Sequence, residues 1–105
     1  MKTKIFIDSI DLEEIKFFDE KINIYGVTTN PTLAKRFNMS DDIDMVKKIN
    51  SVIPNKEIHV EAFGDSSEEI VDNALRIAKK CKGINLVFKI PFSIIAACIK
   101  LEKTK

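Results

Sequence analysis

The stretch EIHVEAFGDSSEEIVDNALRIAKKCKGINLVFKI, residues 57–90, places two short apolar segments on either side of a region with helical periodicity. Residues 57–62 alternate between polar and apolar side chains, which is typical of a strand. Residues 66–81 open with a capping box and then repeat apolar side chains at helical spacing. Residues 84–90 are almost all apolar, which predicts a strand buried on both faces. A strand, a helix and a second strand in this order predict two parallel strands joined by a right-handed crossover.

The N-terminal part of the chain repeats this alternation. Residues 4–8 and 24–28 predict two further strands, and Asp11 with Glu14 forms a capping box at the start of the helix between them. Within the second connection, Asn30 is expected to cap a helix that opens on a proline.

Two more helices complete the pattern. One is expected to begin at residues 40–42 and to end at Pro54, and a last one to run over residues 93–101. The order β-α-β-α-β-α-β-α predicts an α/β fold with a parallel sheet and a single domain over residues 1–105. Two architectures satisfy it: a small open doubly wound sheet, or the first half of a (β/α)8 barrel, since a whole barrel needs at least ~200 residues.

Composition excludes several classes of protein. The 105 residues include 17 Lys and Arg and 16 Asp and Glu, a net charge of +1, so no electrostatic argument favours nucleic acid or a charged membrane as a partner. No apolar run reaches the ~20 residues that span a bilayer. Cys81 and Cys98 form no CxxC and are expected to be reduced, buried thiols, and with one His they make no metal site. We therefore expect a cytoplasmic protein.

Polar side chains follow each predicted strand, where parallel α/β folds place reactive groups. They are Asp8, residues 28–30, Glu61 and Lys89. Burial of a lysine disfavours its ammonium form and makes the amine a usable nucleophile. The alternatives are that Lys89 reaches solvent or pairs with Asp8, that Asp8 caps a helix, and that Glu61 faces solvent. His59 shares the strand face of Glu61 and is expected to be a packed or surface side chain.

Four segments resemble one family of enzymes. Residues 4–9 (KIFIDS), 26–32 (GVTTNPT), 60–61 (VE) and 88–91 (FKIP) are similar, in this order, to the first four strands of the small transaldolases and fructose-6-phosphate aldolases. The resemblance implies the N-terminal half of a (β/α)8 barrel. It also implies an enzyme of carbohydrate metabolism, in the pentose phosphate pathway, that acts on sugar phosphates and forms homo-oligomers at full length.

The resemblance also implies roles for individual residues. Lys89 corresponds to the lysine that forms a Schiff base, and Asp8 to the carboxylate that assists carbon–carbon cleavage. Glu61 corresponds to the acid/base that works through a bound water, which Thr28 helps to place. Asn30, with Thr29 beside it, corresponds to the substrate-binding segment.

In this chemistry the iminium polarises the bond that breaks, so no metal or cofactor is required. Related aldolases tend to carry Gln where this chain has Glu61, so the carboxylate favours a transaldolase, which transfers dihydroxyacetone between sugar phosphates. After Pro91 the family has a Thr and a Gly, whereas this chain continues Phe92-Ser93-Ile94-Ile95. The residues that bind the substrate phosphate are expected beyond residue 105. We therefore expect the 105-residue chain alone to be inactive, and to be self-associated or loosely folded.

Three alternatives remain at this point. The first is a fructose-6-phosphate aldolase, which releases dihydroxyacetone instead of transferring it. The second is a receiver-like signalling domain, although the sequence Asp8-Ser9 lacks the acidic pair that such domains need after the first strand. The third is a non-catalytic half-barrel fragment.

Overall fold

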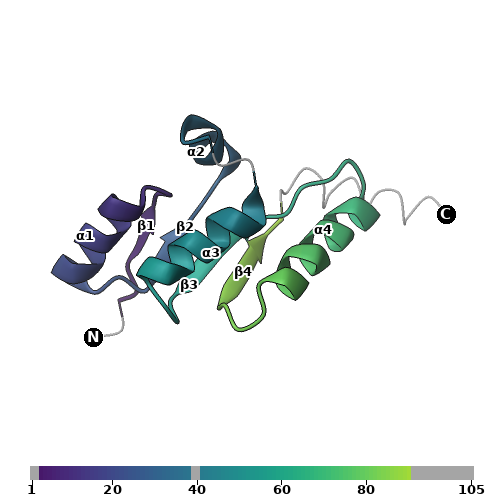
Figure 1. Ribbon diagram of the computed structural model, residues 1–105. Coiled ribbons are helices and arrows are strands. Elements are labelled where there is room, and N and C mark those ends of the chain that lie inside the picture. The colour runs from purple at the N-terminus through teal and green to yellow at the C-terminus, as the bar shows by residue number, and fades with distance from the viewer. Residues whose placement is uncertain (1–2, 39–40, 91–105) are drawn as a thin grey trace.

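The computed structural model describes residues 3–38 and 41–90 and contains four strands that alternate with helices (Figure 1). In chain order the elements are β1 (Phe6–Asp8), α1 (Leu12–Ile22), β2 (Gly26–Thr28), α2 (Pro31–Arg36), α3 (Asp42–Val52), β3 (Glu57–Glu61), α4 (Ser67–Lys80) and β4 (Leu86–Lys89). The predicted alternation is confirmed. The helix expected over residues 93–101 lies outside the described residues, as does Cys98.

The strands form one sheet in the order β1-β2-β3-β4, and all three neighbouring pairs are parallel. A doubly wound sheet reverses its order at a switch point, as in 2-1-3-4-5, so that alternative is wrong. Figure 1 shows α1, α3 and α4 over the same face of the sheet. Three βα units followed by a fourth parallel strand, with the long helices on one face, are the arrangement of the first half of a (β/α)8 barrel.

The strand register divides the side chains between two faces. Ile7 is paired with Val27, and Val27 with Ile58, so these side chains lie on the face that the helices cover. There they join the core together with Val46 and Ile49 of α3. The opposite face, which we call the open face, carries these side chains: Phe6, Asp8, Thr28, Glu57, His59, Glu61, Val87 and Lys89.

The open face explains a difference from the sequence prediction. All four residues of β4, Leu86–Lys89, are half-buried instead of buried on both faces. Leu86 and Phe88 pack against the core, whereas Val87 and Lys89 lie on the open face and are half-buried there. The apolar run of β4 is therefore suited to a closed barrel, of which this sheet is half.

Gly26 makes room for an aromatic layer on the open face. A Cβ at this position would collide with the carbonyl oxygen of Glu57 and would lie 2.8 Å from the Phe6 ring. Without it, the Phe6 ring lies across β2 and meets the His59 ring at 4.8 Å between centroids, in an edge-on arrangement. Any side chain at residue 26 would displace this layer.

The helix caps follow the sequence prediction with two differences. Asp11 accepts hydrogen bonds from the backbone N–H groups of Glu13 and Glu14, and Ser66 accepts one from Glu69. The Glu69 carboxylate accepts from the N–H of Asp65, one residue before the position that a capping box specifies. The second difference is at Asp11, whose N–H donates to Ser9 Oγ at 3.1 Å, where a capping box would use the Glu14 carboxylate. Asp41 caps α3, inside the expected range of residues 40–42. No helix of the described residues is long and apolar enough to cross a membrane.

A half-buried lysine joins two units at the amino-terminal end of the sheet. Lys56 Nζ donates hydrogen bonds to Asp19 Oδ1 at 2.6 Å, to Asn23 Oδ1 at 2.7 Å and to the carbonyl oxygen of Ile24 at 2.6 Å. The side chains of Lys56 and Asp19 are only 23% and 24% exposed, so water competes weakly for this ion pair. Lys56 thereby fixes the start of β3 against the end of α1.

We expect Lys56→Met to lower the free energy of unfolding by about 1.5–3 kcal/mol, the range for a hydrogen bond to a charged group, because it removes three such bonds, one of them to the carbonyl of the buried Ile24. Urea unfolding followed by circular dichroism measures the change. Lys48→Met is the matched control, since it removes the exposed Lys48–Asp44 pair, in which the side chains are 51% and 56% exposed. The control substitution should lower the free energy of unfolding by less than about 0.5 kcal/mol. Equal losses in the two variants would contradict the role of Lys56.

Candidate active site

Four of the predicted site residues lie together on the open face, toward the carboxyl ends of the strands. Asp8 is in register with Thr28 on the neighbouring strand, and Glu61 is in register with Lys89. Neighbouring strands lie about 4.8 Å apart, so each pair consists of adjacent side chains. The structure therefore gathers on one surface residues that are up to 81 positions apart in the sequence.

Thr28 holds the carboxylate of Asp8. The Thr28 hydroxyl donates a hydrogen bond to Asp8 Oδ1 at 3.0 Å and lies 3.5 Å from the carbonyl oxygen of Ile7. Asp8 is exposed and accepts this bond across the gap between β1 and β2. The alternative in which Lys89 pairs with Asp8 is wrong for the described residues, because the Asp8 carboxylate forms no ion pair there and accepts a hydrogen bond from Thr28.

Lys89 and Glu61 form the second pair. Both side chains are half-buried, so Lys89 is neither fully buried nor fully exposed at the end of its strand. Within residues 3–38 and 41–90, no carboxylate lies within ion-pair distance of the Lys89 ammonium. The amine is thus available to a ligand on the open face, with the Glu61 carboxylate on the adjacent strand.

Asn30 and Thr29 lie in the loop after β2, and each makes a hydrogen bond that stabilises the local structure. Asn30 Oδ1 accepts the N–H of Leu33 at 2.9 Å as the cap of α2, which leaves the amide nitrogen to donate to a ligand. The Thr29 hydroxyl donates to the carbonyl oxygen of His59 at 2.8 Å, and the residue is 1% exposed. These contacts attach the loop to β3, and the substrate-binding roles of both residues stay predictions.

A second layer of side chains lies one step closer to the amino-terminal end of the sheet. His59 is in register with Thr28 and Val87 and shares the face of Glu61, as the sequence predicts. Its Nε2 lies 2.9 Å from Glu57 Oε1, and its ring packs on Phe6. His59 is therefore a packed side chain in the layer below Glu61 and Lys89.

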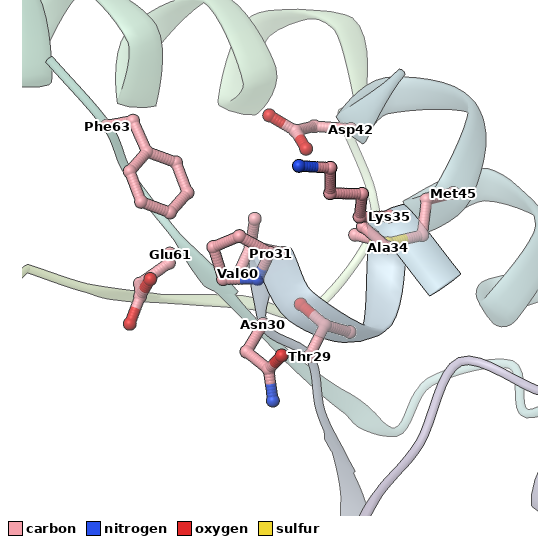
Figure 2. A pocket seen from close by; sticks show the side chains of 10 residues that line it. All are labelled: Thr29, Asn30, Pro31, Ala34, Lys35, Asp42, Met45, Val60, Glu61 and Phe63. Atoms are coloured by element: carbon pink, nitrogen blue, oxygen red, sulfur yellow. The ribbon is translucent and has the colours of Figure 1, made fainter. Parts of the chain in front are cut away.

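A pocket of about 310 Å³ opens beside this site, between α2 and the loop after β3 (Figure 2). Val60, Met45 and Pro31 contribute its apolar walls, and Glu61 lies at its edge. Figure 2 shows the side chains of Lys35 and Asp42 pointing toward one another at the rim.

Sequence analysis missed this rim because it joins side chains of two different helices, α2 and α3. Both residues fall in regions that the sequence describes only as helical surface, and no local spacing connects them. Burial raises the pKa of the Asp42 carboxyl above its usual range, although the Arg76 guanidinium opposes the shift and Asp41 adds to it.

The described cysteine agrees with the expectation of a buried thiol. Cys81 is free and 3% exposed, and burial raises the pKa of its thiol. The thiol is therefore neutral and a weak nucleophile at neutral pH. In the same part of the chain, no group of three or more His, Cys, Asp and Glu side chains could hold a metal ion.

Comparison with known proteins agrees with this geometry. The model of one family, Transaldolase/Fructose-6-phosphate aldolase, matches residues 5–104. The chain belongs to this family. The match includes all four strands and every residue of the candidate site.

Some relatives are named as transaldolases and another is named as a fructose-6-phosphate aldolase. A protein of Dehalococcoides mccartyi named probable transaldolase is 35% identical over 88 residues, which are 84% of this chain and 40% of the relative. A probable fructose-6-phosphate aldolase of Streptococcus pneumoniae is 30% identical over 89 residues, with the same two shares. A probable transaldolase of Clostridium botulinum is 39% identical over 88 residues, 84% of this chain and 39% of the relative. The chain thus spans about two fifths of the length of the curated relatives it matches.

Proposed function

We propose that residues 1–105 supply the catalytic half of a transaldolase, which transfers a dihydroxyacetone unit between sugar phosphates through a Schiff base on Lys89. The observation that carries the proposal is the pairing of Lys89 with Glu61 on the open face, at the carboxyl end of the sheet. A nucleophilic amine beside a proton-transfer group is the arrangement that imine formation requires. The family match supports this assignment.

The reaction begins when the neutral Lys89 amine attacks the ketone carbon of a ketose phosphate. The resulting carbinolamine loses its hydroxyl as water, which takes up a proton as it leaves, and a protonated imine forms. Asp8 then accepts the proton of the C4 hydroxyl while the C3–C4 bond breaks. The electron pair of the C3–C4 bond moves into the iminium, and an aldose phosphate departs. The three-carbon unit stays on Lys89 until a second aldose phosphate accepts it by the reverse steps.

Glu61 and Thr28 assist different steps. Glu61, adjacent to Lys89 in the sheet, delivers the proton to the leaving hydroxyl through a water molecule and takes it back on hydrolysis. Thr28 holds the Asp8 carboxylate by the 3.0 Å hydrogen bond, so that it faces the substrate. The Asn30 amide binds the substrate hydroxyls beside the lysine, with Thr29 supporting the loop.

The second candidate is an aldolase that releases dihydroxyacetone from fructose 6-phosphate. One relative bears this name, and the alignment covers the same shares of both chains as that with the Dehalococcoides transaldolase. The two activities form the same imine and differ in the fate of the three-carbon unit. The carboxylate at Glu61 favours transfer.

Four further properties stay predictions that accompany this function. They are sugar phosphates as partners, homo-oligomers at full length, a cytoplasmic location and a place in the pentose phosphate pathway.

The experiment compares the two activities in a completed barrel, in which residues 1–90 are joined to the C-terminal remainder of the Dehalococcoides relative. With fructose 6-phosphate as donor, we expect the donor to be consumed only when an aldose phosphate acceptor is present. Coupled assays measure the released aldose phosphate and any free dihydroxyacetone. Release of dihydroxyacetone at the same rate without an acceptor would instead identify an aldolase.

A further inference from the structure

The segment that follows β3 is attached to the rest of the fold at both of its ends. At its start, the N–H of Ala62 donates a hydrogen bond to the carbonyl oxygen of Lys89 at 3.0 Å. At its other end, the Glu69 carboxylate accepts the N–H of Asp65 at 2.7 Å, and Ser66 caps α4. The segment therefore connects the strand that carries the reactive amine to the first turn of α4.

The middle of the segment is held against α4. The side-chain amide of Asn73 donates a hydrogen bond to the carbonyl oxygen of Phe63 at 2.6 Å. A Cβ on Gly64 would lie 2.6 Å from the Cβ of Glu69 and 2.7 Å from the backbone nitrogen of Ile70, so the chain lies directly on the helix at this point. The backbone of Phe63 is consequently fixed on both sides, whereas its side chain is 41% exposed.

The ring of Phe63 lines the pocket of about 310 Å³ that opens beside Glu61. Figure 2 shows the side chains of Phe63 and Glu61 on one side of this pocket and residues of α2 on the other. The lining runs from the loop after β2 to the loop after β3, so the pocket lies on the side of Glu61 that is away from β4. Apolar and aromatic walls with a few polar groups, here Asn30 and Glu61 among them, are typical of a ligand pocket.

We propose that Phe63 is a specificity-determining residue whose ring contacts the carbon chain of the aldose part of the substrate, and that Asn73 is the positioning residue that holds it there. The inference rests on the proposed transaldolase function, in which the three-carbon unit is bound to Lys89. The aldose part extends away from that amine, and the pocket beside Glu61 lies away from β4. An aromatic face offers apolar contact to the C–H groups of the chain, while the polar groups of the pocket orient its hydroxyls.

The test compares two ligands in the completed barrel. Dihydroxyacetone can form the imine but lacks the aldose part, which fructose 6-phosphate carries. Phe63→Ala should raise the fructose 6-phosphate concentration at half-maximal borohydride trapping about tenfold, because it removes an aromatic contact. The half-maximal concentration of dihydroxyacetone should not change. Asn73→Leu, which removes the donor to the Phe63 carbonyl, should shift the two ligands in the same pattern by a smaller factor, whereas a general loss of folding would affect both ligands equally.

Phe17→Ala is the matched control. Phe17 is 54% exposed on α1, so the substitution removes a comparable ring from the helix layer and should leave both half-maximal concentrations unchanged. Circular dichroism checks that each variant is folded. Equal shifts for the two ligands, or an unchanged value for fructose 6-phosphate in Phe63→Ala, would overturn the inference and leave the proposed function standing. An unsubstituted barrel that forms no adduct on Lys89 with either ligand would overturn the proposed function, and this inference with it.

Discussion

Lys89→Met should abolish the covalent adduct that borohydride traps between the completed barrel and dihydroxyacetone or fructose 6-phosphate. Methionine keeps the length and much of the packing of the lysine stem, and it removes the only atom that can form the imine. In the unsubstituted protein, reduction should leave one adduct per chain on the peptide that contains Phe88-Lys89-Ile90. Mass spectrometry of the digested protein locates the modified residue.

A second lysine serves as the control for this experiment. Lys48→Met removes an exposed amine from α3, away from the open face, and should leave the adduct and its position unchanged. An adduct that persists in Lys89→Met, on any other lysine, would contradict the assignment of Lys89 as the nucleophile. Because trapping requires only imine formation, it tests Lys89 separately from the transfer reaction.

Glu61→Gln should slow turnover in the completed barrel by about 10²–10⁴, the usual contribution of general acid–base assistance. Glutamine preserves the size and hydrogen-bonding capacity of the side chain but cannot exchange a proton with the water beside Lys89. We expect kcat to fall while KM changes little, since the interaction is made in the transition state. Steady-state rates with saturating acceptor measure both constants.

Glu57→Gln is the matched control, on the same strand and the same face, four residues from Glu61. Glu57 pairs with His59 Nε2 at 2.9 Å in the layer below the reactive amine, so the substitution should change turnover by only a few-fold. A change confined to KM in Glu61→Gln would show that Glu61 binds substrate. Comparable losses of kcat in both variants would indicate a general effect of charge on the open face.

The strands of this chain were predictable because their apolar pattern is local. Alternation over residues 57–62 identified β3 and the face that Glu61 shares with His59, and the register confirms this arrangement. Parallel pairing then brings the carboxyl ends of the strands to one edge of the sheet, so the grouping of Asp8, Thr28, Glu61 and Lys89 also followed from the sequence. Their catalytic roles rest on the resemblance to the family and remain predictions.

Features that depend on several elements were not predictable. The burial of β4 was overestimated because an apolar run does not show whether a second layer covers the strand. The three contacts of Lys56 join the end of α1 to the start of β3 over more than thirty residues, and no local pattern indicates them. The rim formed by Lys35 and Asp42 likewise depends on how α2 and α3 are placed.

Spatial order and chain order coincide in this sheet, since each strand pairs with the strands before and after it in the sequence. Every pairing therefore closes a single connection, which holds one helix after β1 and after β3 and two helices, α2 and α3, after β2. Synthesis delivers these connections in order from the N-terminus. Each βα unit can consequently add to the units already made as it leaves the ribosome. Lys89, on the last of the four strands, would join a surface on which Asp8, Thr28 and Glu61 had already been placed.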